Sequence, residues 1–135
     1  MNARFALSLV VVAAACLSAC NGNGEPSDAV GAKVLRNLLE RANVPAKLVS
    51  FKKTNGRPAH IGNADVYEYW YEAEVQFPEG YEAKCSEEKE RGPCNALGLV
   101  DDRSFRKNEI LKGEGTLHFS GTPKGGWTAE DGQTY

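Results

Sequence analysis

Cysteine thiols have the widest chemistry of any side chain in this sequence, because a thiol can be acylated, oxidised to a disulfide or bound to a metal. The 135-residue chain has four of them: Cys16, Cys20, Cys85 and Cys94. The first two follow a nearly apolar stretch, residues 5–15, that begins after a short start with one basic side chain. Directly after Cys20 the composition becomes polar. This pattern is typical of a secretory signal peptide.

The residues Leu17-Ser18-Ala19-Cys20 resemble the lipobox of bacterial lipoproteins. In that family the cysteine sulfur is diacylated, the peptide is cut just before the cysteine, and the new amino group is acylated. The resemblance implies a signal peptide over residues 1–19, a lipid on Cys20 and a lipidated tether over residues 20–27. A single domain over residues 28–135 would follow. Two or more acyl chains attach a protein stably to a bilayer, so the resemblance implies a membrane as one partner.

Alternatives for this stretch are ordinary secretion, a retained membrane helix, and acylation of Cys16. The apolar run of about fifteen residues is short of the roughly twenty that span a membrane. Cys16 lacks the large aliphatic residue three positions earlier that Leu17 supplies for Cys20. Asn21 follows Cys20, in place of the aspartate that resembles an inner-membrane retention signal in enteric bacteria. We therefore expect the protein in the cell envelope, on the outer membrane and facing the periplasm.

If Cys16 leaves with the signal peptide and Cys20 carries lipid, Cys85 and Cys94 remain as an even pair in an exported domain. Such pairs form disulfides in oxidising compartments. A redox or metal role fits less well, because the spacing is not Cys-x-x-Cys and no neighbouring histidine completes a zinc-binding set. The sequence thus predicts a structural disulfide between these two residues, no metal site and no cofactor.

The charge balance argues against one class of partner. Without residues 1–19 the chain has 116 residues, enough for one domain, with 15 basic and 18 acidic side chains. Affinity for nucleic acid depends mainly on neutralising phosphates. The negative net charge therefore predicts no nucleic-acid partner.

Side chains suited to catalysis are few. His60 and His118 have no metal-ligating neighbour at a recognised spacing, so we expect surface or edge histidines. Glu68, Glu72 and Glu74 share one face of a predicted strand; paired carboxylates do acid–base work when burial separates their pKa values, but a solvated face is favoured here. The sequence has no Gly-x-Ser-x-Gly elbow and no phosphate-binding glycine loop. We predict no catalytic residue, and whether the domain is an enzyme stays open at this point.

The elements that position these side chains follow from hydrophobic periodicity. Apolar residues recur at three- and four-residue steps up to residue 42, after the capping candidates Ser27 and Asp28, which predicts an amphipathic helix. Strict alternation over residues 65–77 predicts a half-buried strand, long enough to need a bend or bulge. The remaining expected segments are strands at 47–54, 96–100, 109–120 and 126–129, a turn at Asn55-Gly56, a loop over 57–63, and a polar excursion over 81–95 with the cysteine pair.

This order of elements predicts an α+β domain, in which one N-terminal helix packs on a curved antiparallel sheet of four to five strands. A small β-sandwich or barrel is the alternative. The order of elements and the final Thr-x-x-x-Gly-Trp hairpin resemble the cystatin-like and NTF2-like architectures. The NTF2-like resemblance implies a cavity between helix and sheet.

Aromatic side chains are the candidates for a binding surface. Tyr67, Tyr69 and Tyr71 share one face of the 65–77 strand, and buried tyrosines need partners for their hydroxyls. They are either core residues at the open end of the sheet or the lining of a pocket or partner surface. Trp70 and Trp127 are candidate anchors of the same surface, since tryptophan is enriched at binding hot spots. Trp70 could instead pack beneath the cysteine excursion.

Two classes of function follow. The first is a membrane-anchored envelope lipoprotein whose non-enzymatic domain binds a protein partner or a small ligand, with an inhibitor of an exported hydrolase as one variety. The second is a hydrolase or isomerase that uses an NTF2-like cavity, which would need a carboxylate or histidine facing inward. The missing catalytic constellation favours the first class.

Overall fold

The computed structural model describes residues 24–135, so the predicted signal peptide and Cys20 lie outside the described residues. The elements are α1 (Asp28–Arg41), β1 (Lys47–Ile61), β2 (Ala64–Phe77), β3 (Tyr81–Ala83), η1 (Glu88–Glu90), α2 (Arg91–Leu97), β4 (Arg103–Phe105), β5 (Glu109–Gly121) and β6 (Trp127–Thr128). The predicted helix is confirmed as α1. Its N-cap is Ser27, whose hydroxyl accepts a hydrogen bond of 3.2 Å from the N–H of Val30.

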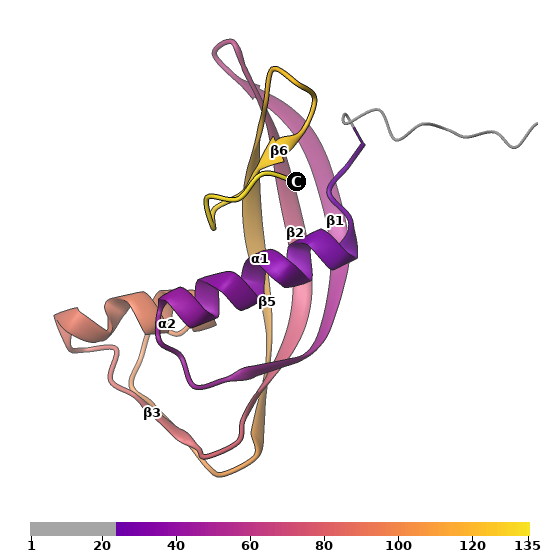
Figure 1. The fold of residues 1–135 in the computed structure, drawn as a ribbon. Coiled ribbons are helices and arrows are strands. Elements are labelled where there is room, and N and C mark those ends of the chain that lie inside the picture. Colours follow the sequence, from indigo (N-terminus) through magenta and orange to yellow (C-terminus); the bar gives the residue numbers. More distant parts are fainter. Residues whose placement is uncertain (1–23) are drawn as a thin grey trace, which may run out of the picture.

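Four strands form one antiparallel sheet in the order β1-β2-β5-β6, and β3 pairs with β4 in a small second sheet. Figure 1 shows that the large sheet is curved and that α1 lies across its concave side. The sheet of the described residues is not closed on itself. The predicted α+β fold is therefore confirmed, and the sandwich or barrel alternative is wrong.

β1 is much longer than the sequence predicted. A turn was expected at Asn55-Gly56 and a loop over 57–63, but β1 continues to Ile61 and pairs with β2 from Lys47 to Ile61. Tyr67 packs over Gly56 so closely that a Cβ atom there would stand 1.9 Å from the tyrosine hydroxyl. This long-range contact overrides the local turn signal, and the hairpin turns at Gly62-Asn63 instead.

The alternating strand is confirmed as β2, which pairs with β5 without any shift of register from Phe77–Glu109 to Val66–Ser120. The bulge expected in β2 is found instead in the neighbouring strand β1. The register between β1 and β2 shifts between Leu48 and Ser50 and again between Lys53 and Asn55. Bulges increase local twist and bend a strand, so β1 takes up the irregularity at the edge of the sheet.

The excursion after β3 carries the confirmed disulfide. Cys85 and Cys94 are joined with an S–S distance of 2.08 Å and a Cα–Cα distance of 5.7 Å. The strand predicted over 96–100 is wrong, because α2 continues to Leu97 and ends at Gly98, which has the left-handed φ of 71°. A glycine in this conformation is a common end of a helix. The disulfide therefore fixes α2 to the segment that follows β3.

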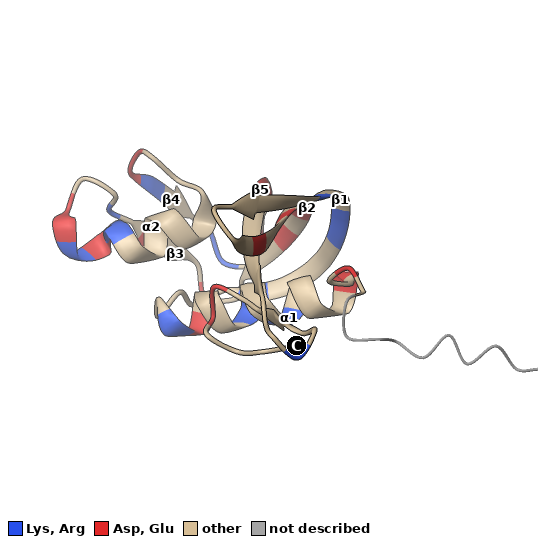
Figure 2. Cartoon of the chain, turned by 90° about the horizontal axis from the view of Figure 1, so that it is seen from above, with Lys and Arg blue, Asp and Glu red and all other residues tan. Residues whose placement is uncertain are grey.

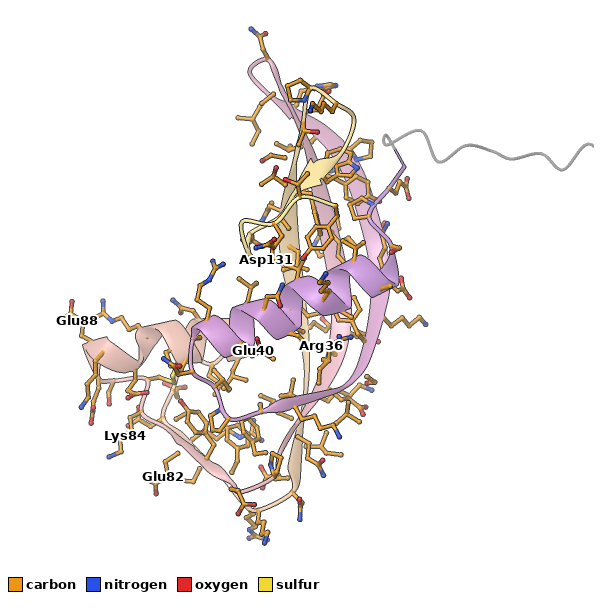
Figure 3. All side chains as sticks on the ribbon, viewed as in Figure 1. Arg36, Glu40, Glu82, Lys84, Glu88 and Asp131 are labelled. Atoms are coloured by element: carbon orange, nitrogen blue, oxygen red, sulfur yellow. A yellow bond between two sulfur atoms is a disulfide. The ribbon has the colours of Figure 1, made fainter. Side chains whose placement is uncertain are left out.

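Two apolar clusters pack between α1 and the sheet. The cluster toward α2 contains Leu35, Leu39, Val44, Ala73, Val75, Phe77, Ala83, Cys94 and Phe105. The cluster toward β6 contains Val34, Tyr67, Tyr69, Leu117, Phe119 and Ala129. Beside α1, the buried Asp131 accepts hydrogen bonds from the side chains of Asn37 and Tyr135 (Figure 3). These bonds hold the C-terminal loop against the helix.

Candidate functional site

Two of the three aligned tyrosines belong to the core. Tyr67 is 2% exposed and Tyr69 is fully buried. Both hydroxyls are satisfied, since that of Tyr67 accepts from Lys53 Nζ at 2.8 Å and that of Tyr69 donates to the carbonyl of Ser27 at 2.9 Å. Burial, followed by the charge of Asp28, raises the pKa of Tyr69. Neither ring is available to a partner, which agrees with the core interpretation of these two residues.

Tyr71 differs from the other two, because its ring borders a hollow. It stacks on Phe51 with ring centroids 5.0 Å apart and lies over Gly115, where a Cβ atom would stand 2.3 Å from the tyrosine hydroxyl. Burial, and after it the charge of Glu130, raises the pKa of Tyr71. Of the predicted aromatic set, Tyr71 is thus the member that a ligand in this hollow would touch.

Trp70 lies on the other face of β2, away from α1. It is half-buried, and the guanidinium of Arg57 stands 5.9 Å from its ring. The disulfide excursion packs into the cluster with Phe77 and Leu39 on the helix side of the sheet. The excursion therefore does not cover Trp70, and the structure does not bring Trp70 together with Tyr71.

Trp127 packs near the start of the described chain. Its ring meets Tyr67 edge-on at 5.8 Å, and its Nε1 donates to the carbonyl of Gly24 at 2.8 Å. Lys53 Nζ donates to the carbonyl of Pro26 at 3.1 Å. Residues 24–27, the described part of the predicted tether, are therefore held against the sheet by side-chain donors.

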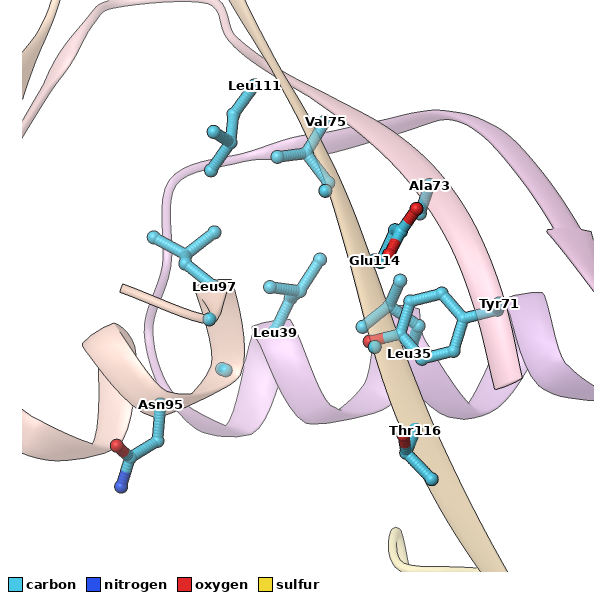
Figure 4. Close-up of a pocket in the computed structure, with 14 residues that line it drawn as sticks. Leu35, Leu39, Tyr71, Ala73, Val75, Asn95, Leu97, Leu111, Glu114 and Thr116 are labelled. Carbon is cyan, nitrogen blue, oxygen red and sulfur yellow. The ribbon is translucent and has the colours of Figure 1, made fainter. Parts of the chain in front are cut away.

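The hollow beside Tyr71 is a groove between β5, α1 and α2 (Figure 4). It encloses about 150 Å³. The apolar side chains that border it are Leu35, Leu39, Ala73, Val75, Ala96, Leu97 and Leu111, and its β5 side continues through Gly113, Glu114, Gly115 and Thr116. We call this hollow the β5 groove. Its volume suits one apolar side chain or a ligand of similar size.

Two glycines of β5 line the groove, but only one of them leaves space open, because the ring of Tyr71 fills the space beside Gly115. Gly113 and Gly115 occupy positions of β5 whose side chains would face α1, between the inward-facing Leu111 and Leu117. A Cβ atom at Gly113 would meet nothing within 4 Å. Hydrophobic periodicity predicts a strand here but not the open space beside Gly113. A glycine inside a strand also marks places where a ligand or another backbone approaches closely, and that was the available signal.

The β5 groove holds little catalytic potential. Among the residues that line it, Glu114 is the one carboxylate, and it is exposed at the rim, with no histidine beside it. His118 lies outside the lining, and His60 forms an exposed pair with Asp65 at 2.7 Å. Within residues 24–135 there is no group of three or more side chains suited to a metal ion. A lone exposed carboxylate is not the pair of groups with separated pKa values that acid–base catalysis uses.

Comparisons with known proteins add no family. No protein-family model matches the chain, and neither a curated protein nor a solved structure is significantly similar to it. In the described part of the chain, the helices are too short or too polar to cross a bilayer.

Proposed function

We propose that the protein is a membrane-anchored envelope lipoprotein whose domain is not an enzyme and binds a protein partner or small ligand in the β5 groove. The observation that carries the binding role is the groove itself, an apolar hollow that Gly113 of β5 leaves unfilled. Ligand sites are concave, mostly apolar and bordered by a few polar groups. The β5 groove has this composition, with apolar side chains from α1, α2 and β2 and with Tyr71 and Asn95 among its lining residues.

The lipid anchor rests on the Leu17-Ser18-Ala19-Cys20 motif, and the contacts of the described chain agree with a short tether. The carbonyl groups of Gly24 and Pro26 accept hydrogen bonds from the side chains of Trp127 and Lys53, respectively. Four residues span at most about 14 Å when fully extended. A lipid on Cys20 would therefore keep the domain close to the outer-membrane surface facing the periplasm.

The anchor is tested by Cys20→Ser. Cells expressing the wild type or the variant are labelled with a clickable palmitate analogue, and their membranes are separated on a density gradient. We expect the wild type to carry label and to sediment with outer membranes, and the variant to be unlabelled and soluble. Label on the variant would refute acylation at this residue, and wild-type protein in inner membranes would refute the proposed location.

Binding in the β5 groove is tested by Gly113→Leu, which fills the groove from an open position. Gly92→Leu is the matched control, since a Cβ atom there also meets nothing within 4 Å and Gly92 does not line the groove. Tagged full-length proteins are purified from detergent-solubilised envelopes, and copurifying proteins and small molecules are quantified by mass spectrometry. We expect a ligand shared by the wild type and the control to be lost from Gly113→Leu. Identical profiles for all three proteins would reject the groove as the binding site.

A further inference from the structure

The β5 groove lies along a strand edge that the described chain leaves open. β6 pairs with β5 only at Ser120 and Gly121. Two residues before Ser120, the N–H of His118 donates to the carboxylate of Glu130 at 3.1 Å. The remaining edge of β5, from Glu109 to Leu117, has no strand beside it among residues 24–135.

The free backbone groups on this edge can be assigned. The N–H of His118 points away from β2 toward Glu130, and that of Thr122 points away from β2 to Gly126. Because N–H directions alternate along a strand, the N–H groups of Thr116, Glu114 and Lys112 point to the same open edge. Within residues 24–135 no strand lies beside this part of the edge to accept from them. An open edge of this kind is a template for an added strand.

The charged side chains of β5 on the face away from α1 indicate which charged residues an added strand should have. Across β2 and β5, Lys112 is opposite Glu74, whereas Glu114 is opposite Glu72. Like charges opposite each other on a sheet are unfavourable. Lys52 of β1 is opposite Glu72, and Figure 2 shows the basic segments of β1 beside acidic segments of the sheet. On the other side of Glu114 no strand of residues 24–135 supplies a basic side chain, so a basic residue there would complete the row.

We propose that the open edge of β5 binds an extended polypeptide segment, which adds a strand to the sheet and inserts an apolar side chain into the β5 groove. The apolar residue lies opposite Gly113, where no side chain of β5 occupies the space. A lysine or arginine of the segment lies opposite Glu114, and an acidic residue opposite Lys112. This inference rests on the binding role proposed above and names the class of partner.

A second copy of the chain is a less suitable occupant. Figures 1 and 2 both place α2 beyond β5, on the side away from β1. Residues 95–98 of α2 and its C-cap border the groove there. A second copy would have to bring its own α1 and α2 to this side of the sheet, whereas a single extended segment brings only side chains. The partner that fits is therefore a linear segment of another protein.

The test uses the full-length lipidated protein in nanodiscs and a fluorescent peptide, Ser-Thr-Val-Lys-Leu-Glu-Ser. In antiparallel pairing this probe places leucine opposite Gly113 and lysine opposite Glu114. Fluorescence anisotropy measures its affinity. N-methylation of the lysine amide, which would face β5, should weaken binding at least tenfold, while N-methylation of the leucine amide, which would face solvent, should leave it unchanged. Equal affinities of the two methylated peptides, or no binding of the parent peptide, would overturn the proposal.

Substitutions in β5 test the same contacts by changing the protein and leaving the peptide unchanged. Thr116→Pro removes an edge-facing N–H, and proline is tolerated on edge strands at such positions; we expect at least a tenfold loss of affinity. Thr116→Val keeps the N–H and should bind as the wild type does. Glu114→Lys should no longer bind the parent peptide. It should bind a peptide in which glutamate replaces the lysine. Unchanged binding by Thr116→Pro or Glu114→Lys would overturn the proposal, and if Thr116→Pro does not fold, the methylated peptides decide alone.

Two further outcomes separate this proposal from the general binding role. If the copurifying ligand is lost in Gly113→Leu but kept in Thr116→Pro, the groove binds a ligand and strand addition is wrong. If sedimentation shows a wild-type dimer that Thr116→Pro dissociates, the edge is occupied by a second copy and the proposed partner is wrong. We expect the wild type to be a monomer at the concentrations of the anisotropy experiment.

Discussion

The two long strands that flank β2, β1 and β5, differ in how their far edges are protected. β1 has two register shifts along its pairing with β2, and its sequence includes Lys47, Lys52, Lys53 and Pro58. β5 pairs with β2 without a shift, contains one lysine and no proline, and is covered only near Ser120. Bulges, lysines and prolines discourage other chains from pairing with an edge. The contrast supports the proposal that the open edge of β5, and not that of β1, accepts a partner strand.

The largest expected effect compares two tyrosines of β2, Tyr67 packed over β1 and Tyr71 packed over β5. Tyr67→Ala should lower the free energy of unfolding by about 3–5 kcal/mol, as for other buried aromatic side chains. Its ring is buried and its hydroxyl is the acceptor for Lys53. Tyr71→Ala should cost about 1–3 kcal/mol, a typical value for a single substitution, because the ring of Tyr71 borders the β5 groove. Urea unfolding of both variants measures the difference, and equal losses would contradict the distinction between core and groove.

The second effect concerns the wall of the β5 groove. Replacing Cys85 and Cys94 together by alanine should lower the free energy of unfolding by about 2–3 kcal/mol according to the loop-entropy relation. Hydrogen exchange should speed up in α2, whose residues border the groove, and stay unchanged in β1. Intact mass after alkylation without reduction checks that the wild-type bond exists. Exchange that rises equally in β1 would show that the disulfide supports the whole sheet.

The third effect compares two glycines, one in β1 and one in β5. Gly56→Ala should destabilise the fold by about 1–3 kcal/mol through overpacking, since its Cβ would collide with Tyr67. Gly113→Ala should stabilise it by roughly 0.5–1 kcal/mol, because alanine has less backbone freedom to lose and its Cβ meets nothing. Thermal melts of the two variants should shift in opposite directions. A drop in both would mean that Gly113 needs its glycine for backbone reasons.

The smallest effect concerns the C-terminal loop that covers the upper end of the β5 edge. Burial favours the neutral form of Asp131, but hydrogen bonds from Tyr135, Asn37 and Gln133 outweigh it and hold the pKa of Asp131 below its ordinary value. A depressed folded-state pKa stabilises the fold above the unfolded-state pKa, and this contribution is lost as pH falls through the folded value. The free energy of unfolding of the wild type should therefore exceed that of Asp131→Asn near neutral pH. The difference between the two proteins should shrink below about pH 4. A difference that is constant with pH would contradict this role.

The elements predicted correctly are those specified by residues close in sequence. The three- and four-residue apolar spacing after Ser27 gave α1, and the alternation of tyrosines and glutamates gave β2. The disulfide followed from an even pair of cysteines. In each of these cases the periodicity or the pair is visible in the chain itself and does not depend on which other segment packs against it.

The errors share one cause, which is contact between residues far apart in the chain. Asn55-Gly56 is a strong turn signal on its own, but Tyr67 packs over Gly56 and keeps the backbone extended. Residues 96–100 look like a weak strand, yet Leu97 ends a helix that the disulfide holds against the core. Local preference is a weak guide wherever tertiary packing opposes it.

The sequence alone thus determined an α+β chain with one amphipathic helix, a long half-buried strand and a cysteine pair, because these depend on local periodicity and residue type. Tertiary structure alone decided which tyrosine faces a hollow and which edge of the sheet stays open. Leu35 on α1, Leu97 on α2 and Gly113 on β5 are distant in sequence and border one groove. Sequence spacing does not encode that proximity, because it arises from how the sheet curves beneath α1 and from where the disulfide holds α2.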